Sequence, residues 1–171
     1  MTDILDFSNK FLTVLPDLPD SLQILSCFNN QLTVLPSLPA SLQKIYCSFN
    51  QLTVLPDLPA SLQILFCEMN QLTVLPEIPD SLLELICWEN QLTVLPEIPA
   101  SLQTLDCGNN QLTVLPDLTH CKNLKYLSVG GNNFSDEMNE ILNNNKLNVQ
   151  EKIKLLDDKK LFMYNNNFIL K

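Results

Sequence analysis

The chain has 171 residues, of which 46% are hydrophobic, and this content suffices for the core of one domain and excludes a disordered tail. Its basic residues are 10 lysines against 19 carboxylates, which gives a formal net charge of −9 and an isoelectric point near 4.4. This balance excludes a general nucleic-acid binder, which must neutralise phosphates. The apolar runs are far shorter than the roughly 20 residues that cross a bilayer, and Asp3 and Asp6 oppose a secretory signal peptide.

The sequence consists largely of one short unit repeated at a constant interval. The hexapeptide QLTVLP begins at Gln31, returns at Gln51 and continues at this interval up to Gln111, and cysteines recur in the same way from Cys27 to Cys107. Each unit has the spacing L-x-x-L-x-C-x-x-N-x-L, which the first complete copy fills with Leu22, Leu25, Cys27, Asn30 and Leu32. Such a short fixed period predicts a solenoid in which each unit contacts only its neighbours.

The first unit departs from this pattern. Leu5, Phe7 and Leu12 occupy inward positions, but Lys10 stands where the asparagine is expected. Few residues precede Leu5, so we expect an uncovered first layer, and a monomer or a weak oligomer formed through this N-terminal repeat.

The second half of each unit reads L-P-x-L/I-P, as at Leu35, Pro36, Leu38 and Pro39. Proline fixes φ and removes a backbone donor, so a helix cannot continue there and the segment is expected to be extended and polyproline-like. The unit resembles the leucine-rich repeat, and its LPxLP half resembles the short repeats of secreted effectors of Gram-negative pathogens. This resemblance implies an α/β-type repeat solenoid, a horseshoe with a parallel sheet on its concave side and an extended convex side.

The last clear repeat follows after a slightly longer interval, from Asn110 to Asn132, and its positions are Leu124, Leu127, Val129, Asn132 and Phe134. Beyond it, Ser135 is a suitable N-cap for a short helix, and Asn148 with Glu151 predicts a second helix that begins with a capping box. The segment Leu161–Phe168 has repeat-like spacing and is a candidate final strand. We therefore expect residues 1–134 to form a solenoid of about six to seven repeats, and residues 135–171 to form a small helical cap.

Cysteines are the first candidates for chemistry. Stacked units place five of them in a straight inward row about 5 Å apart, which cannot converge on one tetrahedral metal ion. We interpret them as small core residues, expect no metal and no other cofactor, and infer a reducing, cytoplasmic compartment. Cys121 follows His120 and lies near Asp117, but adjacent residues on a turn seldom present a nucleophile and its base to one substrate. The chain is therefore expected not to be an enzyme.

The positions that vary between copies flank the inward strand residues, and alternation along a strand directs them to the concave face. An exposed apolar and aromatic patch accompanied by carboxylates is typical of a partner-binding surface. The predicted binding residues are Phe28, Tyr46, Phe49, Phe66, Glu68, Met69, Glu84, Ile86, Trp88, Glu89 and Asp106.

Sequence alone thus predicts a non-catalytic scaffold that binds a protein partner of basic and apolar character on its concave face, and that binds neither nucleic acid nor membrane. The resemblance implies an effector that acts in a host cytosol. Three alternatives stay open: the recognition part of a ubiquitin-ligase-type effector whose catalytic domain lies elsewhere, a passive repeat array whose variable positions merely drift, and a binder of small ligands such as glycans or lipids.

Overall fold

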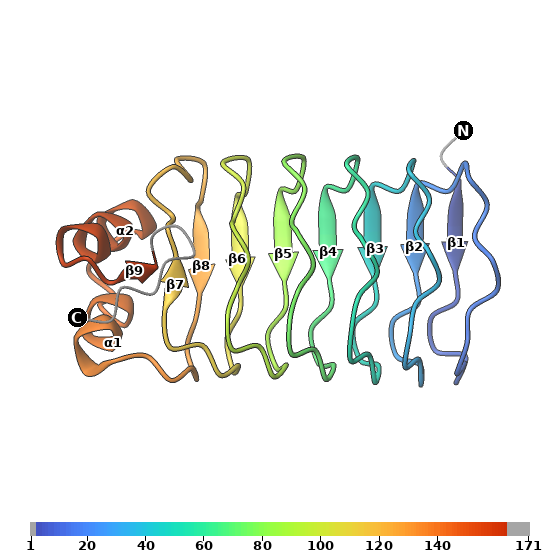
Figure 1. Ribbon diagram of the computed structural model, residues 1–171, viewed down its shortest axis with the longest axis horizontal. Helices are drawn as coiled ribbons and strands as arrows, with labels where there is room; N and C mark the ends of the chain where they lie inside the picture. Colours follow the sequence, from blue (N-terminus) through green and yellow to red (C-terminus); the bar gives the residue numbers. More distant parts are fainter. Residues whose placement is uncertain (1–2, 164–171) are drawn as a thin grey trace.

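Seven short strands, one from each repeat, form a single parallel sheet along a solenoid (Figure 1). The computed structural model describes residues 3–163. Each strand has three residues, and the order in the sheet follows the chain: β1 (Ile4–Asp6), β2 (Ile24–Ser26), β3 (Lys44–Tyr46), β4 (Ile64–Phe66), β5 (Glu84–Ile86), β6 (Thr104–Asp106) and β8 (Tyr126–Ser128). The predicted leucine-rich-repeat architecture is confirmed.

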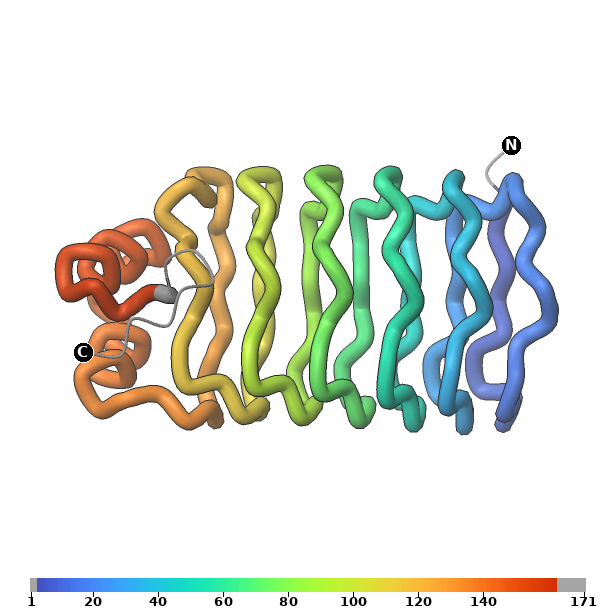
Figure 2. The backbone as a smooth tube through the Cα atoms, in the orientation of Figure 1, coloured from blue at the N-terminus to red at the C-terminus, as the bar shows by residue number. Residues whose placement is uncertain are grey.

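The strand register reproduces the sequence period. Ile24 pairs with Lys44 and Leu65 pairs with Leu85, in each case exactly one repeat further on. The last step is longer, since Thr104 of β6 pairs with Tyr126 of β8. The extra length of this interval is therefore absorbed in the loop before β8, and the backbone tube in Figure 2 continues the same stack of turns through it.

The interior is filled by columns of identical side chains. The middle leucine or isoleucine of β2 to β6 and the cysteines from Cys27 to Cys107 are fully buried. Each of them lies between the equivalent residues of two neighbouring turns, so the burial of one turn depends on the next. At the uncovered end, Leu5 and Phe7 are only partly buried, and Phe11 is 80% exposed.

The asparagine column joins each turn to the one before it. The side-chain nitrogen Nδ2 of Asn70 donates to the carbonyl oxygens of Cys67 in its own turn and Cys47 in the previous turn, at 3.0 and 3.1 Å. Its Oδ1 accepts the backbone N–H of Leu52 at 3.0 Å. Asn30, Asn50, Asn90 and Asn110 make the equivalent bonds. These asparagines therefore have a structural role.

A second polar column stands at the start of each unit. The hydroxyl of Ser61 donates to the carbonyl oxygen of Leu42 at 2.7 Å, and Ser81 and Ser101 repeat this bond one and two turns later. The serine of the nearly unvarying SLQ segment therefore also satisfies backbone acceptors of the preceding turn.

The outer side contains no helix within the described solenoid residues, as the prolines predict. Its LPxLP segments are irregular and extended, and only Leu115–Pro116 forms a strand, β7.

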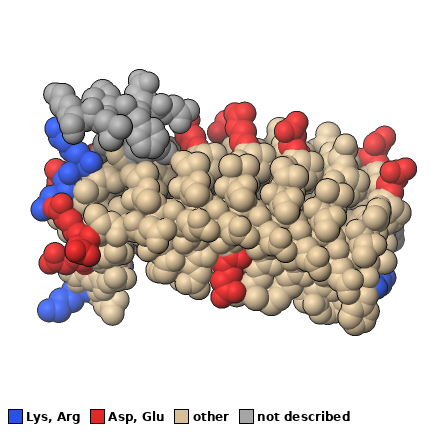
Figure 3. Space-filling model, turned by 60° about the horizontal axis from the view of Figure 1, so that its bottom comes forward, with Lys and Arg blue, Asp and Glu red and all other residues tan. Residues whose placement is uncertain are grey.

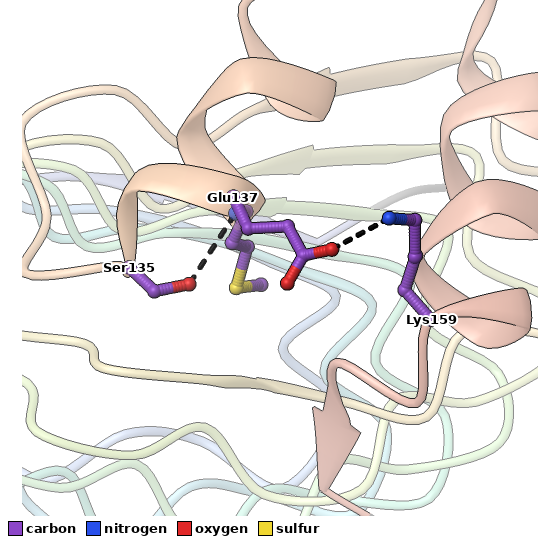
Figure 4. A network of polar contacts seen from close by, with 4 residues as sticks. Ser135, Glu137 and Lys159 are labelled. Atoms are coloured by element: carbon purple, nitrogen blue, oxygen red, sulfur yellow. Dashed lines mark hydrogen bonds and ion pairs between the residues drawn. The ribbon is translucent and has the colours of Figure 1, made fainter.

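Two helices cover the far end of the solenoid (Figure 1). Helix α1 (Asp136–Leu142) begins at the N-cap Ser135, and α2 (Val149–Asp158) begins at Asn148 with the predicted capping box. Both bury apolar residues in the common core, for example Met138 of α1 and Leu156 of α2. Figure 4 shows the ion pair between Lys159 and Glu137, 2.7 Å long, that links the two helices at their exposed side. No helix in residues 3–163 is long and apolar enough to cross a membrane.

Helix α2 also supplies the hydrogen bonds that a further turn would make. Nε2 of Gln150 donates to the carbonyl oxygens of Leu124 and Cys121 at 3.0 and 3.1 Å. Leu124 occupies the position of Leu42, whose carbonyl accepts from the serine of the next unit. Gln150 thus replaces the missing serine and closes the backbone of the last turn.

The candidate final strand is confirmed only in part, and it does not lie in the main sheet. Within Leu161–Phe168, the described strand is β9 (Phe162–Met163), and residues 164–171 lie outside the described part of the chain. β9 pairs in parallel with β7 on the outer side and does not extend the main sheet. Because α1 and α2 already cover the last turn, no free edge remains there for a repeat-like strand, and Phe162 rather than Leu161 is buried.

Replacing Asn70 by alanine tests the asparagine column. The change leaves the N–H of Leu52 without a partner inside the core, and two carbonyl oxygens each keep only one of their two side-chain donors. We expect the free energy of unfolding, measured with urea, to fall by about 1–3 kcal/mol. The matched control is Gln71→Ala at the exposed neighbouring position, with an expected change below about 0.5 kcal/mol. Equal losses for both variants would contradict this role of the asparagine.

Candidate protein-binding face

The outward-facing side chains of the main sheet form three rows that run across the strands. We call these rows together the sheet face. The first row contains Ile24, Lys44, Ile64, Glu84, Thr104 and Tyr126, and the second contains Ser26, Tyr46, Phe66, Ile86, Asp106 and Ser128. The third row follows the strands and contains Phe28, Ser48, Glu68, Trp88 and Gly108. Neighbours in a row are about 4.8 Å apart at the backbone, so each side chain contacts those of adjacent turns.

The apolar part of the sheet face is centred on β3 to β5. Tyr46 and Phe66 pair directly and meet edge to face, with ring centroids 5.2 Å apart and an interplanar angle of 85°. Phe66 is followed in the same row by Ile86. These side chains are half-buried by one another, whereas Phe28 is 38% exposed and lies three turns before Trp88 in the third row. The predicted patch therefore has a contiguous centre with Phe28 at its margin.

The rim of the sheet face consists of residues with a left-handed backbone. Phe49, Met69 and Glu89 have φ values of 55°, 53° and 50°, and Asn29 and Asn109 share this conformation. Asparagine tolerates this region, whereas other side chains with a Cβ atom raise its energy. Phe49 is also 43% exposed. The rim thus carries two features that cost stability, an exposed aromatic ring and a strained backbone, and the sequence pattern indicated neither the strain nor its position.

Carboxylates lie on the sheet face from β4 to β6. Oδ1 of Asp106 accepts the backbone N–H of Gly108 at 3.1 Å. Burial raises the pKa of Glu68, and the negative charge of Asp106 adds to this effect, while hydrogen bonds from its own backbone N–H and from Ser48 oppose it. Oε2 of Glu68 is buried and has no hydrogen-bond partner among the described residues. Lys44 stands in the first row, two turns before Glu84.

Charges elsewhere are distributed unevenly. Figure 3 shows a face whose broad middle is mostly uncharged, with carboxylates along its upper edge and a further carboxylate group below the middle. Basic and acidic groups are mixed at the capped end, and a basic group lies at the opposite end. The described part of the cap carries Lys146, Lys152, Lys154, Lys159 and Lys160. On the sheet face itself, the carboxylates of Glu68, Glu84 and Asp106 outnumber the single lysine, Lys44. This face therefore has a net negative charge.

The outer side has a shallow cavity of about 380 Å³ between two consecutive LPxLP segments. Asp57, Glu77 and Asp80 line it, together with leucine, isoleucine, alanine and prolines. The three carboxyl groups belong to exposed residues. No group of three or more histidine, cysteine or carboxylate side chains in residues 3–163 is arranged to hold a metal ion.

The cysteines are core residues throughout the described chain. All six are free and buried. Burial raises the pKa of Cys27 and Cys107 to about 12, and that of Cys121 to about 11. A nucleophilic cysteine requires the opposite shift. Nε2 of His120 lies 2.6 Å from the carbonyl oxygen of Ile98 and must donate to it, so this nitrogen is not available as a base toward Cys121.

Comparison with known proteins agrees with this geometry. The family described as "Leucine Rich repeats (2 copies)" matches residues 100–158. An effector leucine-rich-repeat domain from Shigella superposes with a TM-score of 0.72 at 30% identity, over 82% of this chain and 74% of that one. The chain therefore belongs to the leucine-rich-repeat proteins. A search of curated protein sequences gives no match.

Two further solved structures are similar. YopM from Yersinia enterocolitica is 33% identical over 72% of this chain, with a TM-score of 0.61. Toll from Drosophila, in a structure of its complex with Spatzle, is 26% identical over 68% of this chain, with a TM-score of 0.54. The chain spans 32% of the YopM chain and 18% of the Toll chain. The likeness thus concerns the repeats of these proteins.

The raised pKa values of the thiols predict alkaline unfolding. The thiol pKa rises from an ordinary value of 9.0 in the unfolded chain to about 11 for Cys121 and about 12 for Cys27, so the folded state retains protons that the unfolded state releases. This contribution to stability is complete below pH 9 and is lost as the pH rises through 11 and 12. We expect a slope of up to about 1.4 kcal/mol per pH unit for each thiol, measured by urea unfolding.

A matched variant separates the contribution of the thiols from that of every other group. Cys47→Val with Cys67→Val removes two fully buried thiols and keeps every other titrating group. Its free energy of unfolding should decrease less steeply above pH 9. An unchanged slope would show that the buried thiols do not govern the alkaline transition.

Phe49→Asn tests the strain at the rim. Asparagine already occupies the equivalent positions 29 and 109 with the same left-handed backbone. Because the Phe49 ring is substantially exposed, little buried area is lost, and we expect stability to increase by about 0.5–1 kcal/mol. The reverse change, Asn29→Phe, should decrease stability by a similar amount. A destabilised Phe49→Asn variant would mean that ring packing outweighs the backbone strain.

Proposed function

We propose that the protein is a non-catalytic scaffold whose sheet face binds a protein partner of basic and apolar character. The proposed contact residues are those predicted from the sequence, from Phe28 in the turn of β2 to Asp106 in β6. The observation that carries the proposal is the contrast between two kinds of surface position within the same repeats.

Several exposed positions on the outer side stay the same from turn to turn. The glutamine, threonine and valine of QLTVLP are repeated in consecutive turns, and Val34, Val54 and Val74 are 50–52% exposed. Sheet-face positions such as Tyr46, Phe66 and Ile86 are less exposed and yet differ in every turn. If relaxed constraint alone explained variation, the more exposed positions would vary at least as much. The contrast favours diversification for binding over a passive array.

The shape and composition of the sheet face favour a protein as its binding partner over a small ligand. Half-buried aromatic rings on a continuous sheet offer a broad surface, and the described cavity lies on the opposite side of the solenoid, at Asp57 and Glu77. Aromatic anchors are enriched among the residues that dominate protein–protein binding energy. The similar Toll repeats occur in a complex with the protein Spatzle, and the similar Shigella domain comes from an effector.

By the same likeness, we infer that the chain is a host-directed effector that acts in a reducing cytosol, with residues 1–134 as the recognition part and residues 135–171 as a cap. The six buried free thiols accord with a reducing compartment. They also disfavour a cysteine-dependent ligase within the described residues, because burial raises the thiol pKa values.

A paired set of variants tests the function. Phe66→Ala with Trp88→Ala removes two rings of the sheet face, and the control, Val54→Ala with Val74→Ala, removes two exposed apolar side chains of the outer side. Each protein is used to capture partners from host-cell lysate, and the affinity of each purified partner is then measured. We expect the first variant to bind at least about 30-fold more weakly, and the control to bind as the unmodified chain does.

Thermal unfolding by circular dichroism establishes that both variants are folded before binding is compared. The proposal fails if the sheet-face variant keeps its partners with unchanged affinity, or if the two variants lose the same partners to the same degree.

A further inference from the structure

In the acidic half of the sheet face, two carboxylates flank the apolar side chains of the β5 turn. Glu68 stands on the turn before β5, Asp106 stands on β6 after it, and Glu84 belongs to β5 itself. Between them lie Ile86 and Trp88. The two flanking carboxylates are therefore two strand steps and one row apart, with this apolar floor between them, and each strand step measures about 4.8 Å.

In the isolated chain, neither Glu68 nor Asp106 forms an ion pair with a described residue. Oε2 of Glu68 is excluded from solvent and has no hydrogen-bond partner among residues 3–163. Asp106 is near enough for its charge to act on Glu68 and, together with Glu68, on the buried Cys87 beneath. Glu68 accepts hydrogen bonds from its own backbone N–H and from Ser48, but it has no counter-ion among the described residues. A partly desolvated carboxylate beside a like charge is unfavourable, and a cation between the two would relieve this cost.

The chemistry of the floor limits what this cation is. Glu68 and Asp106 come from positions two turns apart, so their oxygens do not converge on one small metal ion at coordination distance. A lysine or arginine side chain has several donors at the end of a long aliphatic stem. Such a stem packs on apolar and aromatic groups such as Ile86 and Trp88 while its charged end reaches the carboxylates.

We propose that the protein partner places one lysine or arginine side chain over β5, between Glu68 and Asp106, and a large apolar side chain next to it on the Tyr46–Phe66 pair. The centre of that pair lies one and a half strand steps from β5, which, with an offset of up to one row along the strands, corresponds to about 7–10 Å. In an extended partner segment this is the distance between residues two or three positions apart. The inference rests on the proposed function, since it specifies the partner of the same face.

A displayed library of random 12-residue peptides, selected on the full chain, provides the probe. We expect enriched peptides to carry lysine or arginine two or three positions from a large apolar residue. The double variant Glu68→Gln with Asp106→Asn should weaken the binding of synthetic copies at least about tenfold. The matched control, Asp57→Asn with Glu77→Gln on the outer side, removes the same charge and should change the affinity less than about twofold.

A charge exchange distinguishes pairing from a general loss of fold or charge. A peptide whose basic residue is replaced by glutamate should bind poorly to the unmodified chain and regain affinity, by about tenfold, for Glu68→Lys. Restoration of this kind requires that the two groups meet, and circular dichroism confirms that each variant is folded.

The outcomes separate this inference from the proposed function. Peptides that bind Phe66→Ala with Trp88→Ala poorly but bind the glutamine–asparagine variant unchanged overturn the cation site and leave the binding face intact. Peptides whose affinity is unchanged in both sheet-face double variants contradict both the cation site and the binding face. An unenriched library also overturns the cation site, because the site as described is open to an unstructured peptide, whereas the lysate experiment still decides the proposed function.

Discussion

Hydrogen bonding between consecutive turns is the interaction on which the whole solenoid depends. A strand of three residues cannot satisfy its own backbone, and the outer segments contain prolines instead of a helix. The partners come from neighbours: strand pairing on one side, and the asparagine and serine side chains on the other, as Asn70 and Ser61 illustrate. No turn has a complete set of partners alone, so the turns are stable only as a stack.

That constraint divides the positions of each repeat into two kinds. Leucine, cysteine and asparagine are fixed because a change in one turn disturbs two others, whereas a sheet-face residue pairs with the adjacent strands through its backbone, whichever side chain it carries. The solenoid therefore permits an acidic residue such as Glu84 and an apolar one such as Ile64 at equivalent positions. Even the left-handed rim tolerates Phe49 and Glu89, since the hydrogen bonds to the next turn hold the backbone in place whichever side chain it carries.

Most of this fold follows from the sequence because the repeat period fixes the register. Once Cys27 and Cys47 are equivalent, the pairing of their strands and the direction of every nearby side chain are determined. The repeat period predicts nothing about the structure that follows the last repeat. β9 joins the outer side since the helices occupy the end of the stack, and the role of Gln150 depends on a carbonyl that only the fold brings near. Likewise, the unpartnered oxygen of Glu68 results from packing between turns, which no single repeat encodes.

The two ends of the stack differ, and the difference determines where binding is favourable. Gln150 completes the backbone of the last turn, whereas Leu5 at the other end is only partly buried. Each turn from β4 to β6 packs against another turn on both of its sides, and its interior strand residue is fully buried. A face built on these turns is ordered before a partner arrives, so little conformational entropy is lost on binding. The same rigidity holds Glu68 and Asp106 on either side of β5. The two carboxylates therefore need not be brought together when the cation binds.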